Sequence, residues 1–483
     1  MSSTFFIKKS GNNAFPKKGQ HFAASKRKLI SDEDLATKRR GRAKKPNSRL
    51  NEEISSDSET EGTAAQNDRE AEEEELDETP QEKKLRLAKV YLDQLREEEE
   101  KRAEQQSFET ELVAGRLQED LLEQKGKLQR CIAKDILPPD ASEIRLLRGH
   151  KLPVTCLVIS PDEKYIFSAS KDCSIIKWDV DTGKKLHTIK GGRKGTEARH
   201  VGHTTKVMCM AISSDAKYLA TGDMSKSIII WNPETCTQVS KLKGHRGPVS
   251  ALSFRTGSHD LYSASHDRSV KVWNVDENAY VETLFGHQDA ITGLDCLSRE
   301  RCVTAGGRDN TVRVWKITEE SQLVFHGHGG SIDCIQLINE EHMITGSDDG
   351  SVSVWSVNKK KPLSTVNKAH GSFGDTGLEQ PHWVSSVAAL HNSDTVASGS
   401  HNSEIHLWAC GQAFRSLQPL FSVPVTGFIN SLQFSASGKF LVAGVGQEHR
   451  LGRWWRLNEA KNGIYIIPLK RRGAQPEEPR ATE

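Results

Sequence analysis

Hydrophobic and polar positions change their period twice along the chain. Toward the N-terminus, apolar residues are sparse and show no period. They then recur every three or four positions, which is the spacing of an amphipathic helix. After that, short β-branched runs alternate with Gly, Asp and Ser turns, as strands do. The pattern predicts four segments: a disordered charged arm over 1–81, an amphipathic helical segment over 82–137, an all-β domain over 144–470 and a disordered tail over 471–483.

The helical segment carries an apolar stripe on an otherwise charged surface. The stripe starts with Leu85, Ala88, Leu92 and Leu95. Because no proline interrupts the run before Pro138, we expect one or two long helices, with a break near Gly115. The stripe has to be covered, either by the flank of the all-β domain or by a partner protein, and the sequence leaves both open.

A unit of about 42 residues recurs in the all-β domain, which is the length of a propeller blade. The first five units open on Gly-His and close on a tryptophan 27 or 28 residues after the histidine. The sixth opens on Ala369-His370 and closes on Trp408, and the seventh is taken to run from Phe428 to Trp455. Seven units predict an all-β fold, a seven-bladed WD40 β-propeller preceded by the arm and the helices.

Four of the units also carry an aspartate six positions before the tryptophan. The units resemble WD repeats, in which this aspartate pairs with the Gly-His histidine, often through a Ser or Thr and the indole. The resemblance implies a structural network in each such blade, and not a metal or catalytic site. Its members are His150, Asp172 and Trp178; His245, Asp267 and Trp273; His287, Asp309 and Trp315; and His328, Asp349 and Trp355. Units two, six and seven have Ser225, Asn402 and His449 instead, so we expect these blades to be looser or specialised.

A propeller must close its ring, because an open ring leaves an unpaired strand edge. The run Ile144 to Leu147, just before the first Gly-His, is typical of an outer strand that completes the last blade. The run Ile464 to Ile467 competes for the same role. The sequence does not choose between them.

The formal net charge of +2 conceals two opposite blocks. Counting Lys, Arg, Asp and Glu gives +11 for residues 1–50 and −12 for residues 51–81. Basic clusters of this kind indicate nuclear import or nucleic-acid contacts, and a solubilising tail is the plainer alternative. The residues predicted to direct nuclear localisation are Lys26, Arg27, Lys28, Lys38, Arg39 and Arg40. In the acidic block, Ser55, Ser56 and Ser58 suit an acidophilic kinase, and their phosphorylation would add negative charge.

Several classes of function are disfavoured by what the sequence lacks. Its nine cysteines form no CxxC pair, which is typical of reduced thiols and not of disulfides or zinc sites. No apolar run reaches about 18 residues and no secretory signal is evident, so we expect a soluble intracellular protein without a membrane partner. GxSxG, GxxxxGK[ST] and HExxH motifs are absent. We therefore expect no catalytic residue, metal or cofactor, and a binding scaffold instead of an enzyme.

Departures from the repeat are where binding is expected. The link between units one and two is basic and contains Gly191-Gly192, and unit seven has three arginines beside Trp454-Trp455. Such residues suit RNA phosphates and bases, although a solvated loop or internal arginine pairing explains them too. The candidate RNA-binding residues are Lys184, Lys185, Lys190, Arg193, Lys194, Arg199, Arg450, Arg453 and Arg456. The insertion 371–383 in unit six is neutral and is expected to contact a protein.

Longer stretches are more specific than the repeat. Residues 51–58 (NEEISSDS), 81–89 (QEKKLRLAK), 265–273 (SHDRSVKVW) and 440–455 (FLVAGVGQEHRLGRWW) closely resemble the U3 small nucleolar RNA-interacting WD-repeat protein family. The resemblance implies a nucleolar, non-catalytic subunit of the U3 small nucleolar ribonucleoprotein (snoRNP). It also implies recognition of the box B/C region of the U3 RNA and a role in 18S ribosomal RNA processing within the small-subunit processome. The implied partners are that RNA, a kink-turn-binding small protein, fibrillarin with the other box C/D core proteins, and further processome proteins.

RNA binding through phosphates predicts affinity that falls as salt rises. Two other functions compete with it. A substrate receptor of a cullin ubiquitin ligase commonly carries Arg three positions after the tryptophan, and no unit has one there. A chromatin reader would bind histone tails at the central channel, and a pull-down separates it from an RNA-binding protein.

Overall fold

The computed structural model describes residues 80–102, 109–193, 195, 200–327, 329–374 and 379–472. Several predicted residues lie outside this part of the chain. They are the six localisation residues, the three serines of the acidic block, Lys194, Arg199 and His328.

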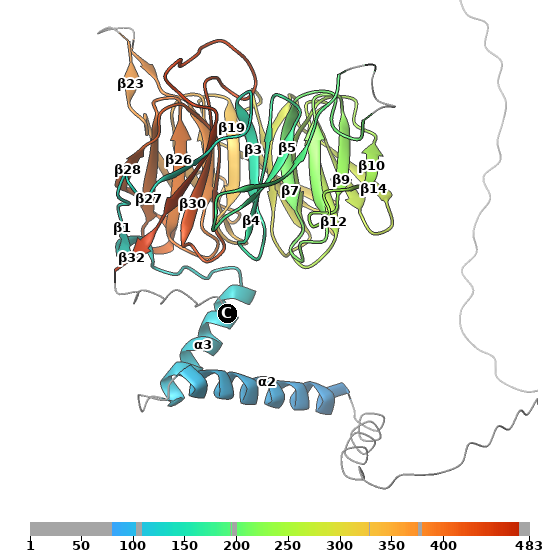
Figure 1. The fold of residues 1–483 in the computed structure, drawn as a ribbon. Coiled ribbons are helices and arrows are strands. Elements are labelled where there is room, and N and C mark those ends of the chain that lie inside the picture. Colours follow the sequence, from blue (N-terminus) through green and yellow to red (C-terminus); the bar gives the residue numbers. More distant parts are fainter. Residues whose placement is uncertain are drawn as a thin grey trace, which may run out of the picture. The chain divides into compact units, whose positions relative to one another are not determined.

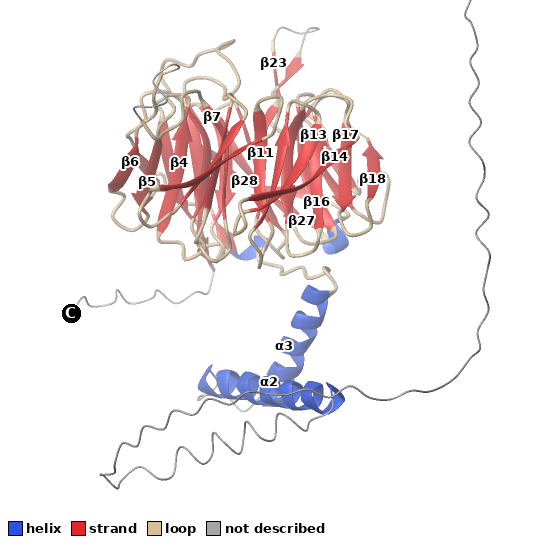
Figure 2. Cartoon of the chain, turned by 90° about the vertical axis from the view of Figure 1, so that its right-hand side faces the viewer, coloured by secondary structure: helices blue, strands red, loops and turns tan. Residues whose placement is uncertain are grey.

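Seven four-stranded antiparallel sheets form the all-β domain, which confirms the predicted seven-bladed propeller (Figures 1 and 2). Blades one to three contain β3 (Val154–Ile159), β4 (Tyr165–Ser170), β5 (Ile175–Asp179) and β6 (Lys185–Ile189); β7 (Val207–Ile212), β8 (Leu219–Asp223), β9 (Ser227–Trp231) and β10 (Gln238–Lys243); and β11 (Val249–Phe254), β12 (Asp260–Ser265), β13 (Ser269–Asn274) and β14 (Ala279–Phe285). Blades four to six contain β15 (Ile291–Cys296), β16 (Arg301–Gly306), β17 (Thr311–Lys316) and β18 (Ser321–His326); β19 (Ile332–Leu337), β20 (His342–Ser347), β21 (Val352–Ser356) and β22 (Ser364–Val366); and β25 (Val384–Ala389), β26 (Thr395–Ser400), β27 (Glu404–Cys410) and β28 (Leu417–Pro424).

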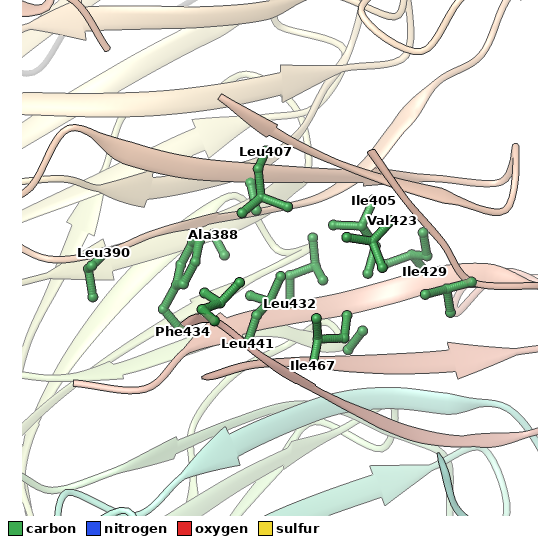
Figure 3. Packing of buried hydrophobic residues seen from close by; sticks show 14 of the residues in the cluster. Ala388, Leu390, Ile405, Leu407, Val423, Ile429, Leu432, Phe434, Leu441 and Ile467 are labelled. Carbon is green, nitrogen blue, oxygen red and sulfur yellow. The ribbon is translucent and has the colours of Figure 1, made fainter. Parts of the chain in front are cut away.

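The strands of a blade differ in burial from the centre outward. All six residues of the innermost strand β3 are buried, whereas the outer strand β6 has three exposed residues. The hydrophobic core lies mainly between neighbouring sheets. Between blades six and seven, Leu407 faces Leu432, Leu441 and Ile467, and none of the four is more than 6% exposed (Figure 3). Burial between successive sheets therefore holds the ring together.

Blade seven closes the ring with residues from both ends of the domain. It contains β29 (Phe428–Phe434), β30 (Phe440–Gly446), β31 (Gly463–Pro468) and, as outer strand, β2 (Arg145–Leu147). Leu146 pairs with Tyr465, so the two stretches that competed in the sequence lie side by side. Without β2, β31 would be an unpaired edge.

One tryptophan of the predicted repeat is misplaced. Leu441 of β30 pairs with Ile467. In blade one the equivalent residue Ile166 pairs with Trp178, so Ile467 takes the tryptophan position in blade seven. Trp455, which was predicted to close this unit, is 40% exposed and lies in the connection between β30 and β31. The prediction was wrong because a 16-residue connection happens to place an indole at the repeat spacing.

Residues 128–137 dock on the propeller as an extended strap. Asp394 Oδ1 accepts hydrogen bonds from the backbone N–H groups of Ile132 (2.8 Å) and Ala133 (2.9 Å). A short 3-10 helix, η1 (Ala133–Asp135), follows, and β1 (Ile136–Leu137) then pairs with β32 (Lys470–Arg471) near the end of the described chain (Figure 1). The predicted helical segment 82–137 is therefore not α-helical in this part, because backbone groups that a helix would pair internally bond to the propeller instead.

Two helices precede the strap, α2 (Pro80–Arg102) and α3 (Glu109–Gln124). The expected break near Gly115 is absent, since Gly115 lies inside α3, where one glycine costs about 1 kcal/mol relative to alanine. Leu95 of the stripe is buried, while Leu85 and Leu92 are exposed. Neither helix, nor any other in the described part of the chain, is long and apolar enough to cross a membrane.

Candidate nucleic-acid interface

The blade networks define one face of the propeller. We call upper the face that carries the turns between second and third strands and the connections between blades. In blade three, His245 Nδ1 lies 3.0 Å from Asp267 Oδ2 and its Nε2 lies 2.8 Å from Ser263 Oγ, which also accepts a hydrogen bond from Trp273 Nε1 at 2.8 Å. Although burial acts to raise the pKa of Asp267, the His245 contact and the hydrogen bonds from Ser269 hold that pKa well below its usual range. A fully bonded buried network of this kind stiffens the upper face.

The same four-residue network recurs in blade four. His287 lies 2.7 Å from both Asp309 and Thr304, and Trp315 donates to Thr304 at 2.8 Å. Although burial opposes ionisation, the His287 contact lowers the pKa of Asp309 to about 2. The structure therefore brings together the predicted members in this blade as in blade three.

Blade one contains a variation. His150 Nδ1 is 3.7 Å from Asp172 and 3.1 Å from Ser174 Oγ, which donates to Asp172. Its Nε2 lies 2.7 Å from Ser168, the acceptor of the Trp178 indole. The serine therefore bridges the histidine and the aspartate.

Blade two contradicts the sequence prediction. Ser225 stands at the expected aspartate position, yet His203 Nδ1 lies 2.9 Å from Asp223, and Thr221 bonds both His203 and Trp231. The aspartate has moved two residues toward the N-terminus, and Ser225 donates to it. This blade keeps a complete network and is not loosened.

Blade six lacks the carboxylate. His370 Nε2 bonds Ser398 at 2.8 Å, but its Nδ1 has no hydrogen-bond partner. Burial lowers the pKa of His370 to about 3. In blade five, Trp355 donates to Thr345 and Asp349 accepts from the backbone of Ser351. In the described residues no group of three His, Cys, Asp or Glu side chains could hold a metal ion.

The candidate basic residues do not form one patch. Lys184 and Lys185 lie at the turn between β5 and β6, on the lower face, whereas Lys190 and Arg193 follow β6 on the upper face. The strand β6, which begins at Lys185 and ends at Ile189, runs from the lower face to the upper face. Only the second pair shares a face with the arginines of blade seven.

Residues 447–462 join β30 to β31, and we call them the blade-seven loop. The loop crosses the upper mouth of the central channel, where Leu451 and Trp454 line a cavity of about 610 Å³ with residues of blades two to five. Arg450 points inward: it lines the channel, and its Nη2 donates to the Asp333 carbonyl at 3.0 Å. Arg450 was predicted to contact RNA, but its side chain points into the central channel.

The other two arginines face solvent. Arg453 bonds Glu448 at 2.9 Å but keeps 65% of its side chain exposed, and Arg456 donates to Gln447 at 3.0 Å from an exposed position. Between them lie Trp454, 70% exposed, and Trp455. Cationic side chains alternating with indoles can bind phosphates and stack on bases.

Sequence reasoning missed a cluster of rings that supports Trp455. The insertion in unit six forms a hairpin of β23 (Ser372–Phe373) and β24 (Gln380–Pro381) on the upper face (Figure 1). Ring centroids of Phe373 and His401 lie 5.2 and 4.8 Å from that of Trp455. Burial and His382 lower the pKa of His401 to about 4, so the cluster is uncharged near neutral pH. Its only signal in the sequence was the extra length of unit six.

Comparisons with known proteins agree with the fold. The family model described as WD domain, G-beta repeat, matches residues 141–179, 195–232, 236–274, 278–316, 319–356 and 376–409. A mouse protein named U3 small nucleolar RNA-interacting protein 2 is 63% identical over 89% of this chain and 90% of its own length. The human protein of that name is 65% identical over 82% and 83%.

More distant and structural relatives point the same way. Ribosomal RNA-processing protein 9 of Saccharomyces cerevisiae is 27% identical over 84% of this chain and 91% of its own length. A solved structure described as "Structure of U3-55K" is 64% identical, with a TM-score of 0.67, and matches 68% of this chain and all of that one. A crystal structure of RRP9 WD40 repeats matches equally well, at a TM-score of 0.67 and 64% identity over 69% of this chain and all of that one.

Proposed function

The chain belongs to the family of U3 small nucleolar RNA-interacting WD-repeat proteins, and we propose that it is a non-catalytic subunit of the U3 snoRNP that acts in ribosomal RNA processing. The observation that carries this proposal is the identity of 63–65% to the mouse and human proteins named for U3 RNA interaction, over at least 82% of this chain. The yeast relative named for ribosomal RNA processing supports the same pathway.

The finer assignments follow from the family. The protein recognises the box B/C region of U3 RNA together with a kink-turn-binding small protein. Fibrillarin, the other box C/D proteins and further processome subunits are its neighbours, and it works in the nucleolus. The predicted localisation residues direct the protein to that compartment. Phosphorylation of the three serines changes the charge of the N-terminal arm.

The upper face is the surface that we assign to RNA. Arg453 and Arg456 are exposed there beside Trp454, and Lys190 and Arg193 lie on the same face. Folded RNA is recognised chiefly by shape, by phosphate contacts and by stacking of unpaired bases, and these side chains provide the last two. Lys184 and Lys185 lie on the lower face and are not part of this surface.

Crosslinking in cells tests the function. The tagged full-length chain is immunoprecipitated after ultraviolet irradiation, and both the bound RNA and the crosslinked peptides are sequenced. We expect U3 RNA, with nucleotides of box B/C, attached to peptides of the upper face. Recovery of histone tails or of a ubiquitin ligase without U3 RNA would contradict the proposal.

Salt titration tests the assigned face. Affinity for a U3 RNA transcript, bound by the kink-turn protein, is measured between about 50 and 200 mM salt for two double variants, Arg453→Gln with Arg456→Gln and Lys184→Gln with Lys185→Gln. Each removes two charges. The first should weaken binding and reduce the slope of log affinity against log salt by about 1 for each phosphate that is no longer neutralised, whereas the second should change neither. If both double variants weakened binding equally, the upper face would not be the RNA-binding surface.

A further inference from the structure

Trp454 is presented to solvent in an unusual way. It is the most exposed tryptophan of the described residues, at 70%, although the loop around it is not loosely attached. A β-carbon at Gly452 would lie 2.9 Å from the Trp454 ring, so the indole rests directly on the glycine backbone. The centroid of the His449 ring lies 5.8 Å from that of the indole, with the two rings tilted by 31°. The indole therefore has a defined orientation with a large part of its surface left uncovered.

Three other blades hold the loop beneath this indole, two through lysine side chains and one through a backbone carbonyl. Lys206 of blade two donates to the Leu451 carbonyl at 2.8 Å, and Lys171 of blade one donates to the Gly452 carbonyl at 3.1 Å. Arg450 reaches Asp333 of blade five. Asn430 of blade seven accepts from the Arg450 N–H at 2.9 Å and donates to the Glu448 carbonyl at 3.2 Å. Four blades thus fix four of the five residues from Glu448 to Gly452.

Trp455 has a different role from Trp454. Its ring packs against Phe373 and His401 of blade six, which anchors the far side of the loop. Large apolar side chains held exposed on a rigid support mark binding sites, since ordering them costs little when the ligand arrives.

The charges around Trp454 favour a nucleobase over an apolar protein surface. Arg453 and Arg456 flank the indole and are exposed, whereas Lys171 and Lys206 lie under the loop and bond to its carbonyls. Single-stranded nucleic acid is bound by this combination, in which cations follow the phosphates and an aromatic ring stacks on a base. Stacking needs an unpaired base, because both faces of a paired base are already covered in the helix.

We propose that Trp454 stacks on an unpaired base of the bound RNA and that Arg450 is a positioning residue, which holds the loop by inserting into the central channel. This inference rests on the proposed function, because it takes the bound RNA to be that of the U3 particle. Arg450 itself contacts no phosphate.

The test compares full-length variants for binding of the U3 transcript with the kink-turn protein. Trp454→Ala should weaken binding about tenfold, the loss expected for one stacked base, while the salt slope stays unchanged because no charge is removed. Trp454→Phe should restore most of the affinity. The matched control is Phe285→Ala on the outer strand of blade three, where the side chain is 73% exposed, and it should leave binding unaltered.

Two further variants separate positioning from contact. Arg450→Gln should lower affinity without changing the salt slope, and Gly452→Ala should do the same by displacing the indole. A reduced slope in Arg450→Gln would show a phosphate contact and overturn the positioning role. Full affinity in Trp454→Ala, with normal wild-type binding, would overturn the stacking while leaving the proposed function intact. If Trp454→Ala lost binding to a protein partner and kept its affinity for the RNA, the indole would belong to a protein interface. If the wild-type protein did not bind the U3 transcript, the proposed function itself would be rejected.

Discussion

Blades three and four differ from the corner formed by blades six and seven in what their histidines and tryptophans do. In blades three and four, histidine, hydroxyl, indole and carboxylate form complete buried networks. In the corner, His370 has lost its carboxylate, Ile467 replaces the indole, and two tryptophans have moved to the surface. The regular blades have complete buried networks, and the blade that departs from the repeat carries the exposed tryptophans to which we assign binding.

The largest contrast should appear when equivalent tryptophans of the sequence repeat are truncated. Trp231→Ala removes a side chain that is 1% exposed and should cost about 3–5 kcal/mol of unfolding free energy, because a buried cavity remains. Trp455→Ala removes a ring that is 40% exposed and should cost under about 1 kcal/mol. Denaturant unfolding of both variants measures this. Equal losses would mean that Trp455 is a core residue after all.

The next largest difference in unfolding free energy should appear when the polar residue before the third strand is replaced by alanine in blade three and in blade six. Asp267→Ala leaves His245 Nδ1 without its buried acceptor and should cost about 3 kcal/mol. Asn402→Ala in blade six removes two hydrogen bonds, one of 3.4 Å to the His370 carbonyl and one of 3.2 Å from the Glu404 N–H, and should cost about 1 kcal/mol. Urea unfolding midpoints compare them. A cost for Asn402→Ala that matches that of Asp267→Ala would remove the distinction between the blades.

Acid should loosen the corner before the regular blades. Burial lowers the pKa of His370 and His449 to about 3 and that of His401 to about 4, so each takes up a proton on unfolding once the pH falls below about 6.5. Each of these histidines therefore lowers the free energy of unfolding by up to about 1.4 kcal/mol for every pH unit by which the pH falls, until the pKa of the folded state is reached.

The aspartates of the regular blades act at lower pH. Asp309, with its pKa lowered to about 2, contributes stability that is complete above about pH 4 and lost only between about pH 4 and 2. Hydrogen exchange of backbone amides at about pH 5 should therefore be accelerated first in β25–β31. Earlier loss of protection in β11–β18 would contradict the comparison.

Much of the fold could be predicted because the residues that define each repeat lie close together in the sequence. Gly-His, a β-branched run and a tryptophan at nearly constant spacing identified the first five blades, whereas the seventh was counted from an indole that lies outside its sheet. Ring closure could not be decided, since pairing of Leu146 with Tyr465 joins residues more than 300 positions apart and both stretches are largely apolar. The same limit applies to Asp394, whose bonds to the strap depend on contacts distant in sequence.

The candidate site was predicted by composition but not by geometry. Arg450, Arg453 and Arg456 are similar in the sequence, yet one is directed into the channel and two into solvent, because the loop turns over the channel between them. Likewise Lys185 and Lys190 are five positions apart and lie on opposite faces, because a strand runs between them. Spacing alone does not tell a loop from a strand in so polar a stretch.

Among variants of the complete networks, the smallest expected loss of stability belongs to Ser225→Ala in blade two. This variant tests whether Asp223, and not the residue at the aspartate position of the repeat, carries the network of this blade. If Asp223 carries this network, Ser225→Ala should cost only about 1 kcal/mol, since Ser225 merely donates a hydrogen bond to that carboxylate. His203 would keep its acceptor at 2.9 Å. A companion variant, Asp223→Ala, should be as destabilising as Asp267→Ala in blade three, and thermal unfolding of the pair measures the difference. If Ser225→Ala were the more damaging of the two, blade two would be irregular as its sequence suggests, and regularity would no longer separate the other blades from the corner formed by blades six and seven.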